Sequence, residues 1–472
     1  MIVGQKIEIK ANNKFYTYCR KAFGVYRLAY NYCVERFIKD HADYCAAMEL
    51  YTKKLLEYKN SPLHNTEQPV KPRLPSPLEY KKIFNAERKE KYPFTYEVTK
   101  YASQQAFINF GRAVKTYFDN VKNGKRAKLI KKHKKKCQKS GSTRKINPYF
   151  PKFQKKNYHC GSFYIGGDQI KIATGRSCSK KLENHSSRQY LNIPNFGCVQ
   201  LKENLRFKGH INSVTISLKG GRIYASFSIE ITGDEFKRTH KEPVQSNTCA
   251  GIDLGLKSAL MLSDGISIEA PKPLKAKLRR LARLQRQLDR KRHPRTKGDT
   301  VRVSRSYIKQ SEKISRLHHS IACIRSDFAH KVTTILANHY EHICMENLNV
   351  QGMMSNHKLS RAISDVGFYN LKQKLAYKLA YRHRKLHEAD RFYPSSKLCS
   401  RCGHVKQDLL LSERIYECPE CGYTVDRDLN AAVNLKKIGI VSPEFSPVEL
   451  TALLSDLKKN RIATSSVEAG IR

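Results

Sequence analysis

Four cysteines in the C-terminal part of the chain have the spacing of a metal-binding motif. The pairs Cys399-x2-Cys402 and Cys418-x2-Cys421 are separated by fifteen residues. A glycine follows the second cysteine of each pair, where a tight turn needs one. Four thiolates at this spacing close a tetrahedral Zn²⁺ site on all sides. We therefore predict one zinc ion, structural rather than catalytic, because no coordination position stays open.

Carboxylates interrupt or end otherwise apolar segments. Asp253 lies in "AGIDLG", Glu346 ends "HICME", and Asp426 and Asp428 precede "LNAAVNL". Carboxylates that folding brings together repel one another unless hard cations lie between them. Two Mg²⁺ ions about 3.5–4 Å apart would satisfy such a cluster and promote hydrolysis of a phosphodiester, with Asp253 as the bridging ligand. Taken singly, an acid at the end of a strand is more often a solvated rim residue or a helix cap than a metal ligand.

The stretch "GIDLG" has a second interpretation. It also resembles the first phosphate loop of actin-like and sugar-kinase ATPases, whose fold is related to that of ribonuclease H. That class requires a second phosphate loop rich in Asp and Gly, and the sequence shows none. The charge of the chain also favours a polymer as substrate over a nucleotide.

The composition points to a polyanionic partner. The 472 residues include 89 Lys and Arg against 41 Asp and Glu, a formal net charge of +48. Nucleic acid is the partner that best neutralises such an excess. No apolar run approaches the roughly 18 residues of a membrane span, and "MIVGQKIEIK" lacks the apolar core of a signal peptide, so we expect a cytoplasmic protein without a membrane partner. The ten scattered cysteines are then expected to be buried free thiols.

Periodic patterns divide the chain into blocks. An alternating decapeptide precedes helical stripes at Cys19–Phe37 and Val98–Val121. From Lys122 to Lys156 there are fifteen Lys and Arg and no acid. Residues 160–245 are β-rich, with a hairpin around Gly220-Gly221. Two leucine and isoleucine stripes, 274–288 and 314–328, then predict a helical hairpin with basic outer faces.

Several quoted segments resemble one family. "GIDLGLKSALMLSDG", "CMENLNV", "SNHKLSRAISDVGFYNLKQKLAYK", the four-cysteine motif and "DRDLNAAVNL" occur in the order typical of TnpB, the RNA-guided endonuclease of insertion sequences, and of its descendants, the compact type V CRISPR effectors. The resemblance covers residues 205–437. It implies a transposon-encoded, Mg²⁺-dependent DNA endonuclease that uses a guide RNA and cuts target double-stranded DNA next to a short motif. The sequence does not give the oligomeric state, for which a monomer is favoured.

The resemblance also implies site residues. The catalytic, magnesium-binding acids become Asp253, Glu346 and Asp428, because the family's third ligand directly precedes a hydrophobe-Asn-Ala-Ala stretch, and Asp426 then caps the helix. One alternative is a compact type V CRISPR effector. Another is a non-cleaving DNA-binding accessory protein or regulator, against which the presence of all three acids argues.

The fold that the resemblance implies is an α+β multidomain protein with a split RuvC-like nuclease domain of the ribonuclease H fold. Its expected parts are the first strand of a wedge β-barrel (1–12), a helical recognition lobe (13–121), a basic linker (122–159), the wedge β-barrel (160–245), the nuclease domain (246–396), a zinc-ribbon insertion (397–425), the closing helix of the nuclease domain (426–437), and a C-terminal tail (438–472) with no readable pattern and a composition compatible with disorder.

Two basic segments are candidate nucleic-acid contacts through phosphate and A-form shape. The alternatives are a solvated tether for the first segment and an ordinary exposed helix face for the second. The candidates are Lys131, Lys132, Lys134, Lys135 and Lys136 in the linker, and Arg279, Arg280, Arg283, Arg286 and Arg290 on the helix.

Overall fold

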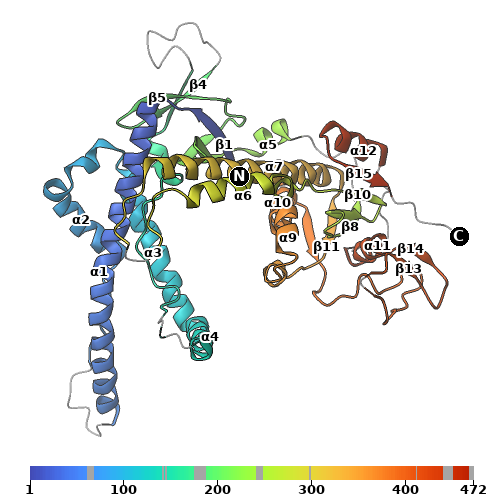
Figure 1. The fold of residues 1–472 in the computed structure, drawn as a ribbon, viewed down its shortest axis with the longest axis horizontal. Coiled ribbons are helices and arrows are strands. Elements are labelled where there is room, and N and C mark those ends of the chain that lie inside the picture. The colour runs from blue at the N-terminus through green and yellow to red at the C-terminus, as the bar shows by residue number, and fades with distance from the viewer. Residues whose placement is uncertain are drawn as a thin grey trace. The chain divides into compact units, whose positions relative to one another are not determined.

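The chain divides into two compact units, Met1–Phe236 and Lys237–Arg472, whose elements are traced in Figure 1. The computed structural model describes residues 1–60, 69–140, 143, 146–174, 188–240, 248–296, 299–410, 412–439 and 450–466. The predicted boundary between residues 245 and 246 lies outside these ranges. None of the helices in the described ranges combines the length and the hydropathy that a membrane span needs.

Unit 1 contains a seven-stranded antiparallel sheet. Its strands are β1 (Ile2–Lys10), β2 (Gly161–Gly166), β3 (Lys171–Thr174), β4 (Gln189–Ile193), β5 (Gly197–Leu201), β6 (His210–Lys219) and β7 (Arg222–Glu230). The strand order is β2-β6-β7-β1-β5-β4-β3. Strand β1 joins the two halves, because Ile2–Glu8 pairs with β7 while Ile9 and Lys10 pair with β5.

The hairpin predicted around Gly220-Gly221 is confirmed. Strands β6 and β7 pair from Lys219–Arg222 outward, and both glycines have positive φ, 57° and 74°. Two such residues in a two-residue turn match the right-handed twist of the strands, and glycine adopts them without strain. Within the described residues, the edge strands β2 and β3 are not paired with each other, so closure into a barrel remains a prediction.

An aromatic core holds the helices of unit 1 together. The helices are α1 (Asn13–Asn60), α2 (Pro77–Lys91), α3 (Tyr101–Lys122), α4 (Lys125–Ser140), α5 (Gly233–Thr239) and the 3-10 turns η1 (Pro93–Glu97) and η2 (Gly167–Gln169). Tyr30, Phe37, Phe84 and Phe110 pack among α1, α2 and α3. After Phe37 no described side chain of α1 is buried. Only the first half of this helix therefore contributes to the core.

The basic segment 122–159, predicted as a linker, is helical over part of its length. Helix α4 occupies Lys125–Ser140 and has no acid in its first turn. Lysine and alanine are good helix formers, so the local sequence supports a helix despite the repulsion between its charges. This part of the segment is a helix and not an extended connection.

Unit 2 is built on a mixed six-stranded sheet. The strands are β8 (Cys249–Asp253), β9 (Leu260–Leu262), β10 (Ile266–Ile268), β11 (His342–Met345), β12 (Lys385–Glu388) and β15 (Thr464–Ser466), and a separate ribbon pairs β13 (Ile415–Glu417) with β14 (Thr424–Asp426). The order of the sheet is β12-β11-β8-β9-β10-β15. Strands β8, β9 and β10 form an antiparallel meander, while β11 and β12 run parallel to β8.

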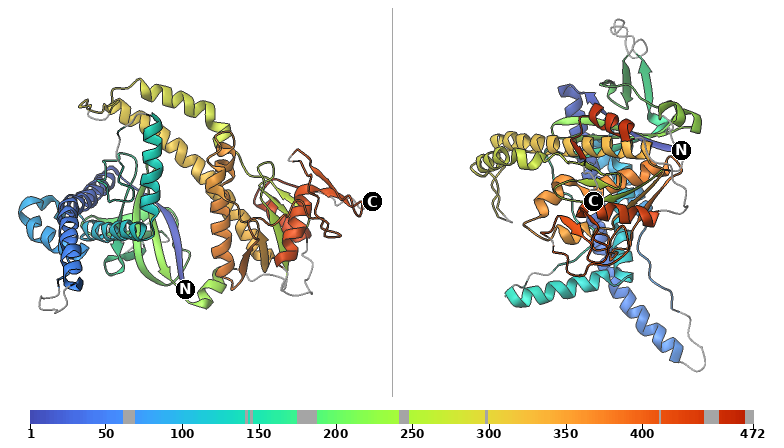
Figure 2. Two further views of the ribbon diagram at one scale, coloured as in Figure 1. Left: turned by 90° about the horizontal axis from the view of Figure 1, so that it is seen from below. Right: turned by 90° about the vertical axis from the view of Figure 1, so that its right-hand side faces the viewer.

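The helices of unit 2 cover this sheet and extend from it. They are α6 (Pro273–Asp289), α7 (Arg305–His339), α8 (Val350–Met353), α9 (Ser360–Val366), α10 (Phe368–Ala380), α11 (Arg427–Gly439) and α12 (Leu450–Lys459). The C-terminal half of α7 supplies Phe328, Val332 and Leu336 to the core on the sheet. Its N-terminal half packs Leu317 and Ile321 against α6. The two helices lie side by side in the views of Figure 2. The predicted helical hairpin is confirmed.

The segment after residue 438 contradicts the reading of a tail without a pattern. Helix α12 buries Leu453 and Leu457 completely in the core of unit 2, and β15 pairs antiparallel with β10. Short three-residue strands leave too weak a period to be found in a sequence. Residues 440–449 and 467–472 lie outside the described ranges.

The scattered cysteines agree only in part with the expectation of buried free thiols. Cys19, Cys33, Cys249 and Cys344 are buried and free. However, Cys45, Cys160 and Cys323 are exposed, Cys137 is partly exposed, and Cys198 is disulfide-bonded. The tenth, Cys178, lies outside the described residues.

The burial of α12 leads to a prediction about stability. Because the Leu457 side chain is fully buried, Leu457→Ala should lower the free energy of unfolding of unit 2 by about 2–5 kcal/mol. Urea unfolding monitored by circular dichroism measures the loss. The matched control is Lys458→Ala, an exposed neighbour whose removal should change the stability by less than about 0.5 kcal/mol. Equal stabilities of the two variants would contradict the packing of α12.

Candidate active site and metal centre

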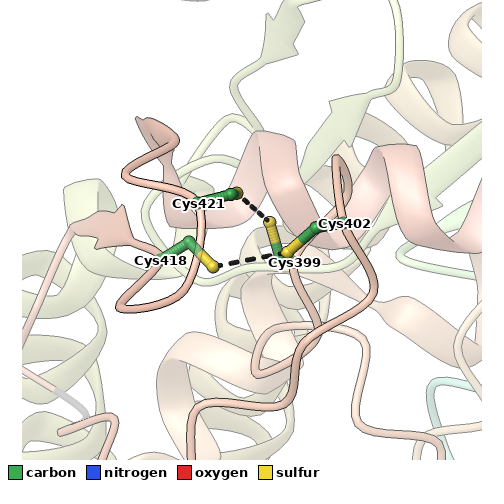
Figure 3. A group of neighbouring side chains, drawn as sticks. All are labelled: Cys399, Cys402, Cys418 and Cys421. Atoms are coloured by element: carbon green, nitrogen blue, oxygen red, sulfur yellow. Dashed lines mark hydrogen bonds between the residues drawn. The ribbon is translucent and has the colours of Figure 1, made fainter.

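The four predicted zinc ligands converge. Figure 3 shows Cys399, Cys402, Cys418 and Cys421 with their sulfurs facing one another. All four Sγ atoms lie within 4.8 Å of one another, with 3.7 Å between Cys399 and Cys421 and 3.6 Å between Cys402 and Cys418. A tetrahedron with Zn–S bonds of about 2.3 Å has S–S edges of about 3.8 Å. The donor set therefore fits a zinc ion in both chemistry and size.

The turn around Cys418 favours a thiolate, whereas the pKa of Cys402 is raised to about 12, because the backbone hydrogen bond at residue 404 is outweighed by hydrogen bonds with the other three cysteines and by burial. The backbone N–H groups of Gly403 and Gly422 donate to the carbonyls of Cys399 and Cys418, and both glycines have positive φ. The pKa of Cys418 is lowered to about 6. Burial acts in the opposite direction, but hydrogen bonds from backbone N–H groups of residues 421 and 420 outweigh it. Deprotonated sulfur is the form that binds metal.

The cysteine ribbon, residues 397–426, packs against the sheet of unit 2. The apolar cluster beneath it joins Cys399 and Tyr416 of the ribbon to Met261 of β9 and Leu429 of α11. Met261 is paired with Asp253 in the β8–β9 ladder. The cysteine ribbon is therefore anchored beside the strand that carries the first predicted acid.

The first two acids lie at the ends of neighbouring parallel strands. Asp253 is the last residue of β8, and Glu346 directly follows β11. Ile252 is in register with Met345, so the next residue of each strand reaches the same edge of the sheet. Both side chains are partly buried. The topology thus brings together two carboxylates that are 93 positions apart in the sequence.

Helix α11 brings the third acid to the same edge. It packs on β8 and β11, and Gly251 is what allows its close approach. A Cβ atom on residue 251 would lie 1.9 Å from the carbonyl oxygen of Ala432 and 2.4 Å from the backbone nitrogen of Lys436. Any side chain there would displace the helix and, with it, Asp428 in its first turn.

The two candidates for the third acid have different roles. Asp426 Oδ1 accepts hydrogen bonds from the backbone N–H groups of Asp428 (2.9 Å) and Leu429 (3.1 Å). These bonds satisfy donors at the helix N-terminus that have no partner within the helix, so the prediction that Asp426 caps α11 is confirmed. The carboxylate of Asp428 is instead near the guanidinium groups of Arg427 (3.4 Å) and Arg414 (3.9 Å).

The three carboxylates interact electrostatically. The pKa of Asp253 is raised well above its usual range, first by burial and then by the charges of Glu346 and Asp428, and its carboxyl shares a hydrogen bond with Glu346. In the described part of the chain, only the four cysteines have their ligand atoms all within 4.8 Å of one another. In the described ranges, the three acids therefore do not form a group of ligand atoms as tight as that of the cysteines.

A loop that the sequence did not single out connects the ribbon to these acids. Ser395 donates a hydrogen bond of 2.8 Å to Glu346 Oε1. From the other side, Asn434 Nδ2 donates to the carbonyls of Ser395 (2.9 Å) and Leu398 (2.6 Å), and Asn430 Nδ2 donates to that of Leu398 (2.7 Å). Both asparagines are fully buried in α11. In the sequence, the signal that could have revealed this connection was the pair of asparagines, four positions apart on the apolar face of the predicted helix.

The arginine-rich face of α6 is exposed. Because the leucines of α6 pack on α7, its five predicted arginines all face solvent. Arg280 and Arg283 line a groove of about 520 Å³ together with Lys277 of α6 and with Lys313 and Arg316 of α7. These last three cations were not predicted. Arg286 and Arg290 border a neighbouring depression, whereas Arg279 lines neither.

Helix α6 is fixed at its N-terminus by a buried acid. Asp365 of α9 accepts hydrogen bonds from the backbone N–H groups of Leu274 (3.0 Å) and Lys275 (3.2 Å), and Arg325 of α7 donates to it at 2.7 Å. No side chain of α6 itself caps the helix. The orientation of the arginine face therefore depends on one carboxylate from a distant segment.

The predicted lysines of the basic segment lie on α4. Lys131, Lys132, Lys134 and Lys135 are exposed there, while the side chain of Lys136 lies outside the described set. Unit 1 thus presents a separate basic helix.

The zinc site leads to a prediction. Cys418→Ser should remove one equivalent of zinc and lower the melting temperature, since structural zinc contributes folding free energy directly. Atomic absorption on dialysed protein measures the metal. Cys160→Ser, a change of an exposed cysteine outside the ribbon, is the control and should keep its zinc. A Cys418→Ser protein with unchanged zinc content would refute the four-cysteine site.

Two protein-family models match the chain. One is described as a probable transposase, OrfB_IS605, and matches residues 226–357. The other is described as the Cas12f1-like TNB domain and matches residues 368–435. The first range includes β8, β11 and the first two acids, and the second includes the cysteine ribbon and Asp428. The two matches together contain the whole candidate site.

Curated relatives match a longer part of the chain. A protein of Streptomyces pristinaespiralis is 38% identical over 232 residues, 49% of this chain and 53% of that protein. InsQ of Escherichia coli K12 is 31% identical over 305 residues, 61% of this chain and 68% of InsQ. Both carry the name "Putative RNA-guided DNA endonuclease". The chain thus spans about half of the first relative and two thirds of the second.

A solved structure has a distant likeness. The mini-RNA-guided endonuclease CRISPR-Cas_phi3 is 11% identical over 94% of this chain and 93% of its own, with a TM-score of 0.42. A TM-score this low does not establish a shared arrangement. Three further curated relatives are named TnpB-like proteins. Together with the match to InsQ, these relatives show that the chain belongs to the TnpB family.

Proposed function

We propose that this protein is an RNA-guided, Mg²⁺-dependent DNA endonuclease encoded by a transposable element, with Asp253, Glu346 and Asp428 as its catalytic acids. The observation that carries the proposal is the convergence of these carboxylates at one edge of the unit 2 sheet, where Glu346 and Asp428 raise the pKa of Asp253. Burying carboxylates together is costly, and cations compensate for it. The names of the relatives supply the reaction class.

The strand order of unit 2 supports a RuvC-like nuclease domain. The order β10-β9-β8-β11-β12, antiparallel for the first three strands and parallel for the last three, is that of the ribonuclease H fold. In such a sheet, the carboxyl ends of the parallel strands form the site. We assign the sheet of unit 1 to the wedge domain and α1 to α3 to the recognition lobe by the same resemblance.

The acids provide the oxygen ligands that Mg²⁺ prefers. When bound, two Mg²⁺ ions supply Lewis-acid stabilisation of the charge that develops on the scissile phosphodiester. Ser395 orients Glu346 by donating to Oε1. Asp426 fixes the first turn of α11 and thereby the position of Asp428. Asp253, which faces both other acids, is the shared ligand of the proposed site.

The basic faces provide binding sites for the guide RNA and the target DNA. Five cations line the groove between α6 and α7, and no acid lines it. Such a groove attracts phosphates without reading base sequence, which suits a protein whose sequence specificity comes from base pairing. The lysines of α4 form a second phosphate-binding face. Binding of phosphates to these faces accounts for the large positive net charge of the chain, +48.

A non-cleaving nucleic-acid-binding protein is the competing function. Such a protein would need the basic faces and the zinc ribbon but would gain nothing from three mutually repelling acids. Asp426 already caps α11, so Asp428 is not needed as the cap and is available as a ligand. The acids therefore favour the nuclease.

Cleavage tests the three acids. Asp253→Ala, Glu346→Ala and Asp428→Ala should each abolish Mg²⁺-dependent cutting of a target plasmid while RNA-guided binding in a gel shift persists, because each removes a ligand but no nucleic-acid contact. Asp426→Ala is the matched control and should be milder, since a lost cap costs about 0.5–2 kcal/mol of stability. Robust cutting by Asp253→Ala or Glu346→Ala would refute the nuclease assignment.

Thermal stability tests the cation site independently of activity. The folded-state pKa of Asp253 is raised, so this group stabilises the metal-free protein only below the pKa of an ordinary carboxyl, and the contribution is lost as pH rises through the raised value. In EDTA, Asp253→Asn should therefore melt higher than the unaltered protein, increasingly so towards pH 8.

Adding Mg²⁺ should raise the melting temperature of the unaltered protein more than that of Asp253→Asn, because only the former keeps the full charge that binds the cation. The control is Asp408→Asn, an exposed acid of the ribbon, which should respond to Mg²⁺ like the unaltered chain. Equal Mg²⁺ responses of Asp253→Asn and the unaltered protein would rule out a cation at Asp253.

Salt dependence tests the groove on α6. Replacing Arg280 and Arg283 with Ala should weaken RNA binding about equally for all sequences and reduce the slope of log K against log salt by about 0.7–0.9 per lost phosphate contact. Filter binding at several salt concentrations measures the slope. The charge-matched control is the exposed pair Lys458→Ala/Lys459→Ala on α12. An effect confined to one RNA sequence would indicate base readout instead.

A further inference from the structure

The loop that follows β12 is anchored on both sides of an exposed ring. At its start, the Ala389 N–H donates to the Met345 carbonyl (2.9 Å), and Ala389 is buried against Cys344 and Leu435 with Tyr393 packed beside them. At its end, buried Ser395 is bonded to Glu346 and held by Asn434. Between these anchors lies Phe392.

Phe392 is held in place by its backbone but not by its side chain. Its N–H donates to Asp390 Oδ1 (2.9 Å), the Tyr393 N–H donates to the Asp390 carbonyl (3.1 Å), and Pro394 follows. Yet the residue is 89% exposed, more than any other large hydrophobic residue in the described part of unit 2. An ordered ring in water adds nothing to folding through burial. Its fixed position therefore calls for a partner outside the chain.

The groups near Phe392 indicate which kind of molecule this partner is. Both anchors of the loop bond to the end of β11, Ala389 to Met345 and Ser395 to Glu346, so Phe392 lies on a loop tied to the strand end that carries the second acid. The exposed Arg391 precedes it in the chain. An exposed ring and an exposed guanidinium on one short loop suit a polymer that presents unpaired base faces along a phosphate backbone. In a duplex these faces are covered by neighbouring base pairs, so only an unpaired strand offers them.

We propose that Phe392 is a stacking platform for an unpaired base of the DNA strand that enters the carboxylate site. The inference rests on the proposed nuclease function and deepens it by assigning to Phe392 the positioning of a base at the site. The platform is sequence-tolerant, because every base has a face to stack. Its anchors couple the position of the base to that of Glu346.

Fluorescence gives a test that does not depend on cleavage. The chain contains no tryptophan, so Phe392→Trp introduces a single reporter whose emission falls when a base stacks on it. In an Asp253→Ala background, single-stranded oligothymidine should quench this tryptophan strongly, whereas the same sequence in a duplex should not. The control is Tyr369→Trp, at an exposed position (65%) on α10. Absence of quenching at residue 392, or equal quenching at both positions, would overturn the proposal.

Cleavage variants separate stacking from simple hydrophobic contact. Phe392→Ala and Phe392→Leu should both lower the single-strand kcat/KM by about 5- to 100-fold, the range that corresponds to the loss of one base–aromatic stack. Phe392→Tyr should retain it. All three should melt like the unaltered protein, because the side chain is exposed. Normal cleavage by Phe392→Leu would show that an aromatic ring is not required and would overturn the proposal.

The fluorescence and cleavage experiments together also distinguish the failure of this inference from the failure of the proposed function. If the unaltered protein does not cut DNA, the nuclease assignment fails, and with it the deduction that the stacked strand is a substrate. If the unaltered protein cuts, Asp253→Ala is inactive, and Phe392→Ala cuts normally without quenching in the Phe392→Trp protein, only the stacking platform is wrong.

Discussion

The close contact between helix α11 and strand β8 is the constraint on which the candidate site depends. Gly251 has no side chain, so the backbone of α11 lies directly on the strand. This contact sets the height of Asp428 above the sheet edge where Asp253 and Glu346 end their strands. The same helix presents its buried asparagines to the first cysteine knuckle. One backbone-to-backbone approach therefore fixes an acidic cluster and a metal-binding ribbon together.

The sequence predicted features that depend on local spacing. The cysteine knuckles, the capping role of Asp426 and the leucine hairpin need only neighbouring residues to be recognised, and the structure agrees. The carboxylates needed the family resemblance as well, because no period relates Asp253 to Glu346. Ser395 and Asp365 could not be found, since each is a single polar residue whose importance comes from a long-range hydrogen bond. Strand β15 was missed because three residues carry no period.

Charge is distributed in two opposite ways in this chain. The cations gather on exposed helix faces, where water and salt screen their repulsion. Two acids inside unit 2 have hydrogen-bond partners there. Asp365 joins α6 to Arg325, and Asp264 accepts a hydrogen bond from the buried Tyr340. The cluster around Asp253 is the exception, because its nearest partners are other carboxylates. Arginines are present at this centre, but Arg427 and Arg414 pair with Asp428, and the pKa of Asp253 is still raised, first by burial and then by the other two carboxylates. In a chain so rich in cations, such an acid is a local departure that function explains best.

The position of β15 in the sheet has a consequence for synthesis. Strand β15 contributes residues 464–466 to a sheet whose first strand is residues 249–253. The ribosome makes the chain from its N-terminus, and domains generally fold in that order. The sheet of unit 1, which ends at residue 230, can therefore form while unit 2 is still being translated. The edge of β10, however, stays uncovered until translation has passed residue 466. During that interval it is a strand edge open to pairing with another nascent chain.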